Sequence, residues 1–339
     1  MSRSTTVPDP ARERTAPDAV HGVDGSGAGG NVGVWIGADP PRIRHALRRI
    51  FEFPRLLTQH RDFVSTTVKR ELQARFTGTL LGWLWPLVYP VFMFAVYYFV
   101  FVELLQQKID GLTDELKPAM GVFMFTGIVV WTGFAEGLSR GTTSIVENGN
   151  LIKKLVFPTE LLPLNSVLVA AVTMGFGVVA YLVATLFGVW PTPTVDLLWI
   201  PAILPLQLLF TYGLALFLAT CNVFLRDTQQ LVALLTTVWM FLTPIFWIPS
   251  ATIMGKDIAP YLEPLENNPM HHLMHVWRSA LMNRTELLAI EDPLVRSRLD
   301  VFEGDPLHSL MIFGAWAIGV FLVGFVVYAL SQRRFADEI

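Results

Sequence analysis

Cysteine and charged residues are scarce in this sequence of 339 residues. The single cysteine, Cys221, excludes a disulfide framework and a Cys-based zinc or iron–sulfur site built from one chain. Charged residues make up 16% of the chain, whereas soluble domains average about 25%. Hydrophobic residues make up 53%, and the mean hydropathy is +0.48. This composition excludes an ordinary soluble domain and predicts an all-α polytopic membrane protein.

Several catalytic and energy-coupling motifs are also missing. No GxxxxGK[ST] phosphate loop occurs, so the chain does not hold ATP by that device. Carboxylates deep within the apolar runs are almost absent, which argues against proton- or sodium-coupled transport. His271, His272 and His275 lie close together without an HExxH pattern, and we interpret them as solvated or hydrogen-bonded side chains. We therefore expect no catalytic residue, cofactor or metal in this chain, and no nucleic-acid partner.

Six apolar runs approach the roughly 20 residues that a bilayer core requires. Most of the 25 lysine and arginine residues fall in segments that we assign to the inner face, which predicts cytoplasmic N- and C-termini. Together the runs predict one transmembrane domain over residues 80–334, followed by a cytoplasmic tail at 335–339. The expected spans cover residues 80–102, 119–138, 161–189, 197–222, 231–248 and 307–330.

Two polar segments precede the first span. Residues 1–40 are rich in Gly, Pro, Asp, Arg, Ser and Thr, and are expected to form a disordered cytoplasmic tail. Residues 41–79 interleave basic and apolar residues and predict cytoplasmic amphipathic helices, divided at Phe53-Pro54 because proline disrupts a helix interior. The apolar stripe of the second helix repeats every four residues and comprises Val64, Val68, Leu72 and Phe76.

A polar and basic segment, ENGNLIKKLVFP at Glu147–Pro158, separates the second and third runs. Its position requires it to lie at a membrane face, and Lys153 and Lys154 favour the cytoplasmic one. Its apolar residues have helical spacing, which predicts a short amphipathic helix that ends at Pro158. Two interpretations remain open: a helix resting on lipid headgroups, and a docking surface for a cytoplasmic partner.

Two further features bear on function. Glu136 lies near the cytoplasmic end of the second span, where it either serves a function or reaches to water from the interface. Asn267–Met282, between the fifth and sixth spans, is amphipathic and too polar to cross the membrane. This pattern predicts an external re-entrant or interfacial hairpin.

The chain resembles the permease subunit of ABC-2 type polysaccharide exporters, the family of O-antigen, teichoic acid and related cell-wall glycan transporters. The resemblance covers roughly residues 61–334. It rests on RFTGTLLGWLWPLVYP (Arg75–Pro90), the ENGNLIKKLVFP segment, FLRDTQQ (Phe224–Gln230), and the NNPM segment followed by Trp277-Arg278.

The resemblance implies a homodimer bound to two copies of a separate cytoplasmic ABC ATPase, which would bind ATP and Mg. The amphipathic segment before the first span would be an interface helix, and the first and fifth spans would line a channel between the two copies. The residues implied to couple the chain to the ATPase are Glu147, Asn148, Asn150, Leu151, Ile152, Lys153, Lys154, Phe157 and Pro158.

The implied cargo is a polyprenyl-diphosphate-linked glycan that crosses the bacterial inner membrane. Arg70 and Arg75 suit the diphosphate, because guanidinium groups pair with phosphate in two-pronged fashion. Aromatic faces suit sugar rings, although membrane aromatics also serve as packing and belt residues. The candidate glycan-channel residues are Tyr89, Phe92, Tyr97, Trp239, Phe241, Phe246 and Trp247.

Two other functions are considered. An ABC-2 permease for a drug or a small lipid would share the fold. A membrane-embedded glycosyltransferase would instead need polar catalytic groups gathered on one face, for which the three histidines and Glu136 are the candidates.

Overall fold

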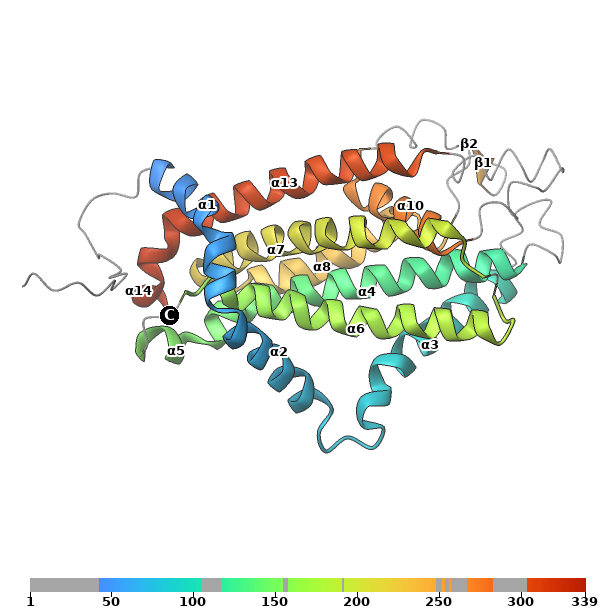
Figure 1. The fold of residues 1–339 in the computed structure, drawn as a ribbon, viewed down its shortest axis with the longest axis horizontal. Helices are drawn as coiled ribbons and strands as arrows, with labels where there is room; N and C mark the ends of the chain where they lie inside the picture. Colours follow the sequence, from blue (N-terminus) through green and yellow to red (C-terminus); the bar gives the residue numbers. More distant parts are fainter. Residues whose placement is uncertain are drawn as a thin grey trace, which may run out of the picture. The chain divides into compact units, whose positions relative to one another are not determined.

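The computed structural model is a helical bundle with a two-stranded ribbon, β1 (Thr252–Ile253) and β2 (Lys256–Asp257) (Figure 1). Apart from that ribbon, it describes residues 43–104, 117–154, 158–190, 192–247, 267–282 and 304–339. The expected tail at 1–40 lies outside these ranges. The four longest helices are α4 (Lys117–Glu147), α6 (Leu161–Leu186), α7 (Ile200–Phe224) and α13 (Pro306–Ser331).

Among the described residues, four helical segments, which contain α4, α6, α7 and α13, are long and apolar enough to cross a membrane. The first and fifth expected spans correspond to shorter helices. One is α3 (Trp85–Tyr98), which follows a 3-10 turn at Gly82–Leu84 and continues as the π-helix η2 (Phe99–Leu104); the other is α8 (Thr228–Leu242). The chain is therefore a polytopic helical membrane protein, and the count of six spans stays a prediction.

Capping residues fix where α10 (Pro269–Leu281) and α13 begin. The Asn268 side chain accepts a hydrogen bond from Met270 N at 3.0 Å, and Asp305 accepts one from Leu307 N at 2.9 Å. A proline follows each cap, at a position where no helical N–H bond is lost. Proline also determines where α8 ends. The helix stops at Leu242 and not at residue 248, because Thr243 precedes Pro244 and a residue before proline avoids the helical conformation.

The predicted break at Phe53-Pro54 is wrong. Helix α1 (Ile43–Gln59) continues through Pro54, and α2 (Arg61–Phe76) follows after His60. The Phe53 ring stacks on Tyr212 with centroids 5.5 Å apart and also contacts rings of α13. This packing keeps the helix continuous despite the hydrogen bond that proline forfeits. The predicted stripe of α2 is confirmed: Val64, Leu72 and Phe76 are buried and Val68 is half-buried.

Helix α4 extends well past the expected end of the second span at residue 138. Its 31 residues make it roughly 46 Å long at 1.5 Å per residue, more than the hydrocarbon core of a bilayer. In the polar last turns, hydroxyl groups are satisfied by carbonyls of the helix itself: Thr142 donates to Leu138 O at 2.8 Å and Ser144 to Gly141 O at 2.7 Å. The helix ends at Glu147, the first residue of the segment Glu147–Pro158 that the resemblance implies to couple the chain to an ATPase; we name it the coupling segment.

Glycines bring α7 and α13 into close contact. A Cβ atom at Gly324 would overlap the carbonyl oxygen of Gly213, and one at Gly213 would overlap the backbone of Phe321. Small residues that let helix backbones approach are a common basis of packing in membranes, where the hydrophobic effect does not drive helices together.

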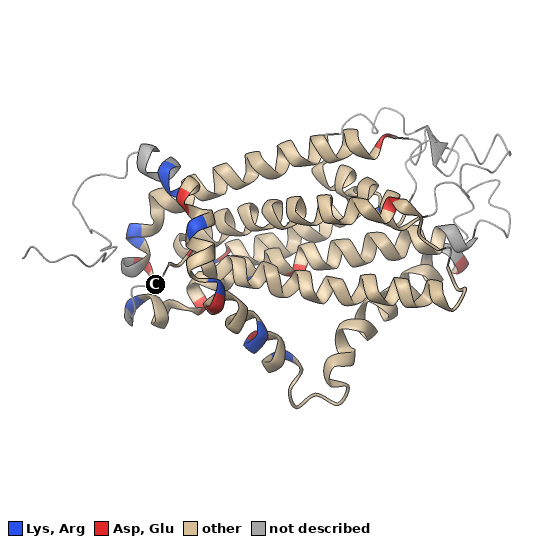
Figure 2. Cartoon of the chain, viewed as in Figure 1, with Lys and Arg blue, Asp and Glu red and all other residues tan. Residues whose placement is uncertain are grey.

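Lysine and arginine gather at one end of the bundle, around α1, α2, α5 (Gly149–Lys154) and α14 (Phe335–Glu338) (Figure 2). The long apolar helices carry almost no such residues between their ends (Figure 2). Residues 335–339, expected as a tail, are partly packed into this end. The ring of Phe335 is buried against Phe224 and Tyr328.

Candidate functional site

A cavity of about 500 Å³ lies among α2, α3, α4, α6, the end of α8 and the residues that follow α8. Most of its lining is apolar or aromatic. Trp85, Tyr89 and Tyr97 come from α3, and Trp131 from α4. Its charged lining residues, Arg75 and Glu136, come from α2 and α4. A mostly apolar cavity with a few polar groups is typical of a small-molecule site.

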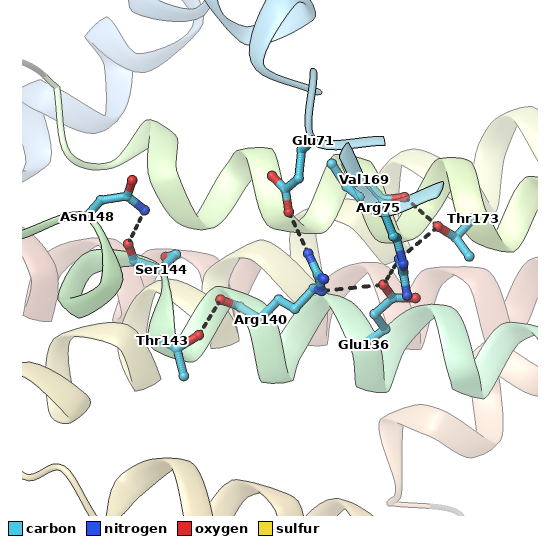
Figure 3. A network of polar contacts seen from close by, with 9 residues as sticks. All are labelled: Glu71, Arg75, Glu136, Arg140, Thr143, Ser144, Asn148, Val169 and Thr173. Atoms are coloured by element: carbon cyan, nitrogen blue, oxygen red, sulfur yellow. Dashed lines mark hydrogen bonds and ion pairs between the residues drawn. The ribbon is translucent and has the colours of Figure 1, made fainter. Parts of the chain in front are cut away.

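Arg75 and Glu136 form a direct ion pair within this cavity (Figure 3). Arg75 Nη1 donates to Glu136 Oε1 and lies 3.4 Å from the hydroxyl of Thr173 on α6. The Arg75 side chain is 29% exposed and that of Glu136 is 20% exposed, so the pair is only partly solvated. Glu136 therefore has a specific partner and does not reach alone to water, while a functional role for it stays a prediction.

A second arginine, Arg140 of α4, extends the ion pair into a network (Figure 3). Arg140 Nη1 donates to Glu71 of α2 at 2.6 Å, and its Nε lies 3.7 Å from the same Glu136 oxygen that Arg75 contacts. Glu136 therefore sits between two guanidinium groups. The four side chains alternate in charge and sum to zero, so their mutual attraction offsets part of the desolvation cost of partial burial.

The polar side of α4 continues from this network to the coupling segment (Figure 3). Thr143 donates to the Arg140 carbonyl at 3.2 Å, and Asn148 Nδ2 donates to the Ser144 carbonyl at 2.8 Å. Asn148 is the turn residue between α4 and α5. One helix thus joins the cavity to the coupling segment.

The predicted coupling residues form a short helical step at the basic end of the bundle. Glu147 ends α4, and α5 contains Asn150, Leu151, Ile152, Lys153 and Lys154. Glu147, Asn150 and Lys153 are exposed, whereas Ile152 packs against the core. Phe157 lies outside the described residues, and Pro158 precedes α6.

The structure brings some of the predicted ligand residues together and separates others. Arg75, Tyr89, Tyr97 and Phe246 line the cavity, and the Tyr97 and Phe246 rings lie 4.5 Å apart. Arg70 is exposed on α2 outside it. The other four candidates do not line the cavity. Phe92 and Phe241 are 60% and 51% exposed. The indole of Trp239 donates to Asn268 at 2.9 Å, and that of Trp247 donates to the Phe241 carbonyl at 3.1 Å.

The predicted hairpin contains a helix, α10, that is buried against α4, α7, α13 and the 3-10 helix η4 (Val195–Trp199). This placement rules out a helix lying flat on the surface. Arg278 explains much of it: its guanidinium lies 3.3 Å from the Phe123 ring centroid and donates to the Pro244 carbonyl at 2.7 Å. Trp277 likewise donates to Gln207 of α7 at 2.8 Å.

The histidines of α10 belong to no metal-holding cluster in the described part of the chain. His272 and His275 are buried, and His272 lies 3.4 Å from the hydroxyl of Ser309. No group of three or more His, Cys, Asp or Glu with metal-holding geometry occurs among the described residues. Glu136 is on another helix and is committed to arginines.

Glu160 is an important residue that the sequence analysis missed. It is 2% exposed, and its carboxylate contacts Arg49 of α1 and Tyr328 of α13. The only local indication of its importance in the sequence was its position: a single acid after Pro158-Thr159, at the start of a long apolar run. Its partners are more than 100 positions away, so no local pattern identified them.

Comparison with known proteins adds independent information. Residues 63–282 match the family described as ABC-2 type transporter. The chain is 34% identical over 221 residues to the O-antigen export system permease protein RfbA of Myxococcus xanthus, covering 65% of this chain and 80% of that protein. Two proteins of the same name from Klebsiella pneumoniae are 28% and 27% identical, each over 66% of this chain and covering 82% and 81% of their own lengths.

Proposed function

We propose a function from one premise: the chain belongs to the ABC-2 type transporter family. It is the membrane-spanning permease subunit of an ATP-driven exporter that moves a polyprenyl-diphosphate-linked polysaccharide across the bacterial inner membrane. The observation that carries this proposal is the match over residues 63–282, together with relatives that are O-antigen export permeases by name.

The energy comes from a separate ABC ATPase, which binds ATP and Mg, because the sequence has no phosphate-binding loop of its own. The coupling segment is where the ATPase docks. Exposed Glu147, Asn150 and Lys153 offer polar contacts, while half-buried Ile152 fixes the segment to the bundle. Movement of this segment reaches the cavity through α4, which ends at Glu147 and also contains Glu136 of the cavity lining.

The basic end of the bundle faces the cytoplasm. Lys and Arg gather there (Figure 2), as expected of cytoplasmic segments in a membrane protein. In this orientation, both described ends of the chain lie inside, and α3 and α8 cross the membrane with the four longer helices to give six spans. Trp83 and Trp85, which are exposed before and at the start of α3, belong to the inner interfacial belt.

Two copies of the chain form the transport pathway. Helices α3 and α8 expose large apolar residues, including Val91 and Phe92 on α3 and Leu234 and Leu235 on α8. These faces contact the second copy or line the channel, whereas other exposed faces contact lipid. Aromatic rings there suit the apolar faces of sugars.

The cavity receives the lipid-linked head group from the cytoplasmic side. Arg75 supplies the cation for a phosphate, and the aromatic and apolar lining accommodates the first isoprene units or the first sugar. Arg70, exposed on α2, attracts the diphosphate from the membrane surface without forming part of the cavity.

Deletion of the chain from its bacterium tests this function. Loss should remove a surface polysaccharide and leave its lipid-linked precursor on the inner face of the membrane. Wild-type chain should restore export, and a chain with Gly/Ser in place of Glu147–Pro158 should be inserted but inactive. An intact surface polysaccharide accompanied by increased drug sensitivity would instead identify a drug permease.

A further inference from the structure

We propose that Glu136 is a displaceable counter-ion. The phosphate of a lipid-linked ligand enters the cavity by taking Arg75 from Glu136, and Arg140 then retains the released carboxylate. This inference rests on the proposed function, because it concerns how the same cavity accepts its anionic ligand. The inference adds roles for Glu136 and Arg140 to the role already proposed for Arg75.

The geometry sets up competition for the Nη1 atom of Arg75. This atom already donates to Glu136 and lies 3.4 Å from the Thr173 hydroxyl, so a phosphate that binds Arg75 in two-pronged fashion through Nη1 displaces the Glu136 carboxylate (Figure 3). Both side chains line the cavity, so a ligand there reaches the pair directly. A phosphate with more than one negative charge and several acceptor oxygens competes well with a single carboxylate.

The carboxylate has a second partner close at hand. Arg140 Nε lies 3.7 Å from Glu136 Oε1, one helical turn away on α4, while Arg140 Nη1 is held by Glu71 (Figure 3). When Arg75 turns to a phosphate, Glu136 can close on Arg140 with a small side-chain movement. No carboxylate is then left unpaired at partial burial, which is the arrangement that would oppose binding most strongly.

Such an exchange makes binding reversible. A free guanidinium in a mostly apolar cavity would hold a diphosphate tightly and oppose its release during transport. With Glu136 in place, every step of entry and exit replaces one ion pair by another, so the difference in free energy between the empty and occupied states stays small. The counter-ion therefore lowers affinity.

Isothermal titration of the full chain in phosphatidylcholine nanodiscs tests the proposal, with farnesyl diphosphate as the probe. Inorganic pyrophosphate and farnesol serve as comparison ligands. Glu136→Gln should bind farnesyl diphosphate about tenfold more tightly than wild type, and Arg75→Gln at least about tenfold more weakly, equivalent to roughly 1.4 kcal/mol each. Asp62→Asn, which removes an exposed carboxylate from α2, is the matched control and should bind like wild type.

A double-mutant cycle separates exchange from a general effect of charge. Arg140→Gln should weaken binding several-fold in the wild-type background, because Glu136 then has no partner other than Arg75. The same change in the Glu136→Gln background should have little effect, because no carboxylate remains to be retained. Strictly additive effects of the two substitutions would overturn the proposal. Unfolding temperatures of all variants confirm that each one is folded.

The remaining outcomes distinguish this inference from the proposed function. If wild type binds farnesyl diphosphate and Glu136→Gln binds it no better, the counter-ion role is wrong while the ligand assignment stands. If neither protein prefers farnesyl diphosphate to farnesol, the cavity is not a diphosphate site and both proposals about it fail. Pyrophosphate binding as tightly as farnesyl diphosphate would contradict a lipid-linked ligand, because the apolar lining would then contribute nothing.

Discussion

Arg49 Nη2 lies 2.8 Å from the carboxylate of the buried Glu160, which joins α1 to the residues that lead into α6. Tyr328 Oη donates to the other carboxylate oxygen at 2.8 Å, and Tyr212 Oη donates to the Glu160 backbone carbonyl at 3.1 Å. Pro158, the last residue of the coupling segment, lies two positions earlier. The segment is therefore anchored at its end to α1, α7 and α13.

Replacing Glu160 with alanine should destabilise the protein by about 2 kcal/mol, because Arg49 and Tyr328 each lose a partner at a buried position. Glu160→Gln should have less than half this effect, since an amide oxygen still accepts hydrogen bonds. Unfolding in detergent, followed by circular dichroism, measures both. Glu52→Ala removes an exposed pair with Arg48 on α1 and should change stability by less than about 0.5 kcal/mol. Equal effects at Glu160 and Glu52 would show that the buried anchor is unimportant.

The crossing of α7 and α13 depends on the absence of a side chain at Gly324. Gly324→Ala should lower the unfolding temperature by several degrees, because the new methyl group would overlap the Gly213 carbonyl. Gly319→Ala on the same helix is the matched control, since nothing lies within 4 Å of its Cβ position. It should be neutral. Thermal unfolding of the two variants measures the difference. Equal unfolding midpoints would contradict this packing.

Arg278 should not be replaceable by lysine. The change keeps the positive charge but loses the planar group over Phe123 and the second carbonyl contact, so we expect a loss of about 1–2 kcal/mol. Arg226→Lys, at an exposed arginine between α7 and α8, should be neutral in the same unfolding assay. A stable Arg278→Lys protein with unchanged export would mean that α10 is held by its apolar contacts alone.

Local patterns predicted much of the helical structure. The four-residue repeat from Val64 to Phe76 predicted the buried face of α2. The polarity of the segment containing Arg278 predicted a re-entrant or interfacial hairpin, and the structure has the 13-residue helix α10 there. The α2 prediction succeeded because periodicity depends only on neighbouring residues. The extent of α4 was missed, since its last turns contain Ser and Thr that read as loop but bond back to the helix.

Contacts between distant residues could not be predicted in this way. Arg75 and Glu136 are 61 positions apart, and each has an ordinary interpretation on its own: a basic residue at the headgroup level and an acid near the interface. Likewise, the sequence grouped the aromatic residues of the first and fifth spans into one lining. The structure divides them, with Tyr97 and Phe246 in the cavity and Phe92 and Phe241 exposed. When a helix is apolar on all sides, hydropathy does not indicate which of its side chains face a cavity and which face outward.

Cross-linking tests the assembly of two copies. In a Cys221→Ala background, Phe92→Cys or Phe241→Cys should give a covalent dimer with a bis-maleimide in native membranes, because both side chains are exposed on the faces that we assign to the second copy. Val179→Cys, at a 53% exposed position on α6, is the control and should remain monomeric. Cross-linking through α6 alone would place the second copy on a different face.

In the proposed function, energy transfer depends on the coupling segment. The most direct test is a transport assay in proteoliposomes that compares the purified chain with its complex with the ATPase, using a lipid-linked glycan and ATP. The account predicts that the chain alone neither hydrolyses ATP nor moves the glycan, that the complex does both, and that replacing Glu147–Pro158 with Gly/Ser abolishes movement. ATP-independent transport by the isolated chain, or full transport with the replaced segment, would contradict it.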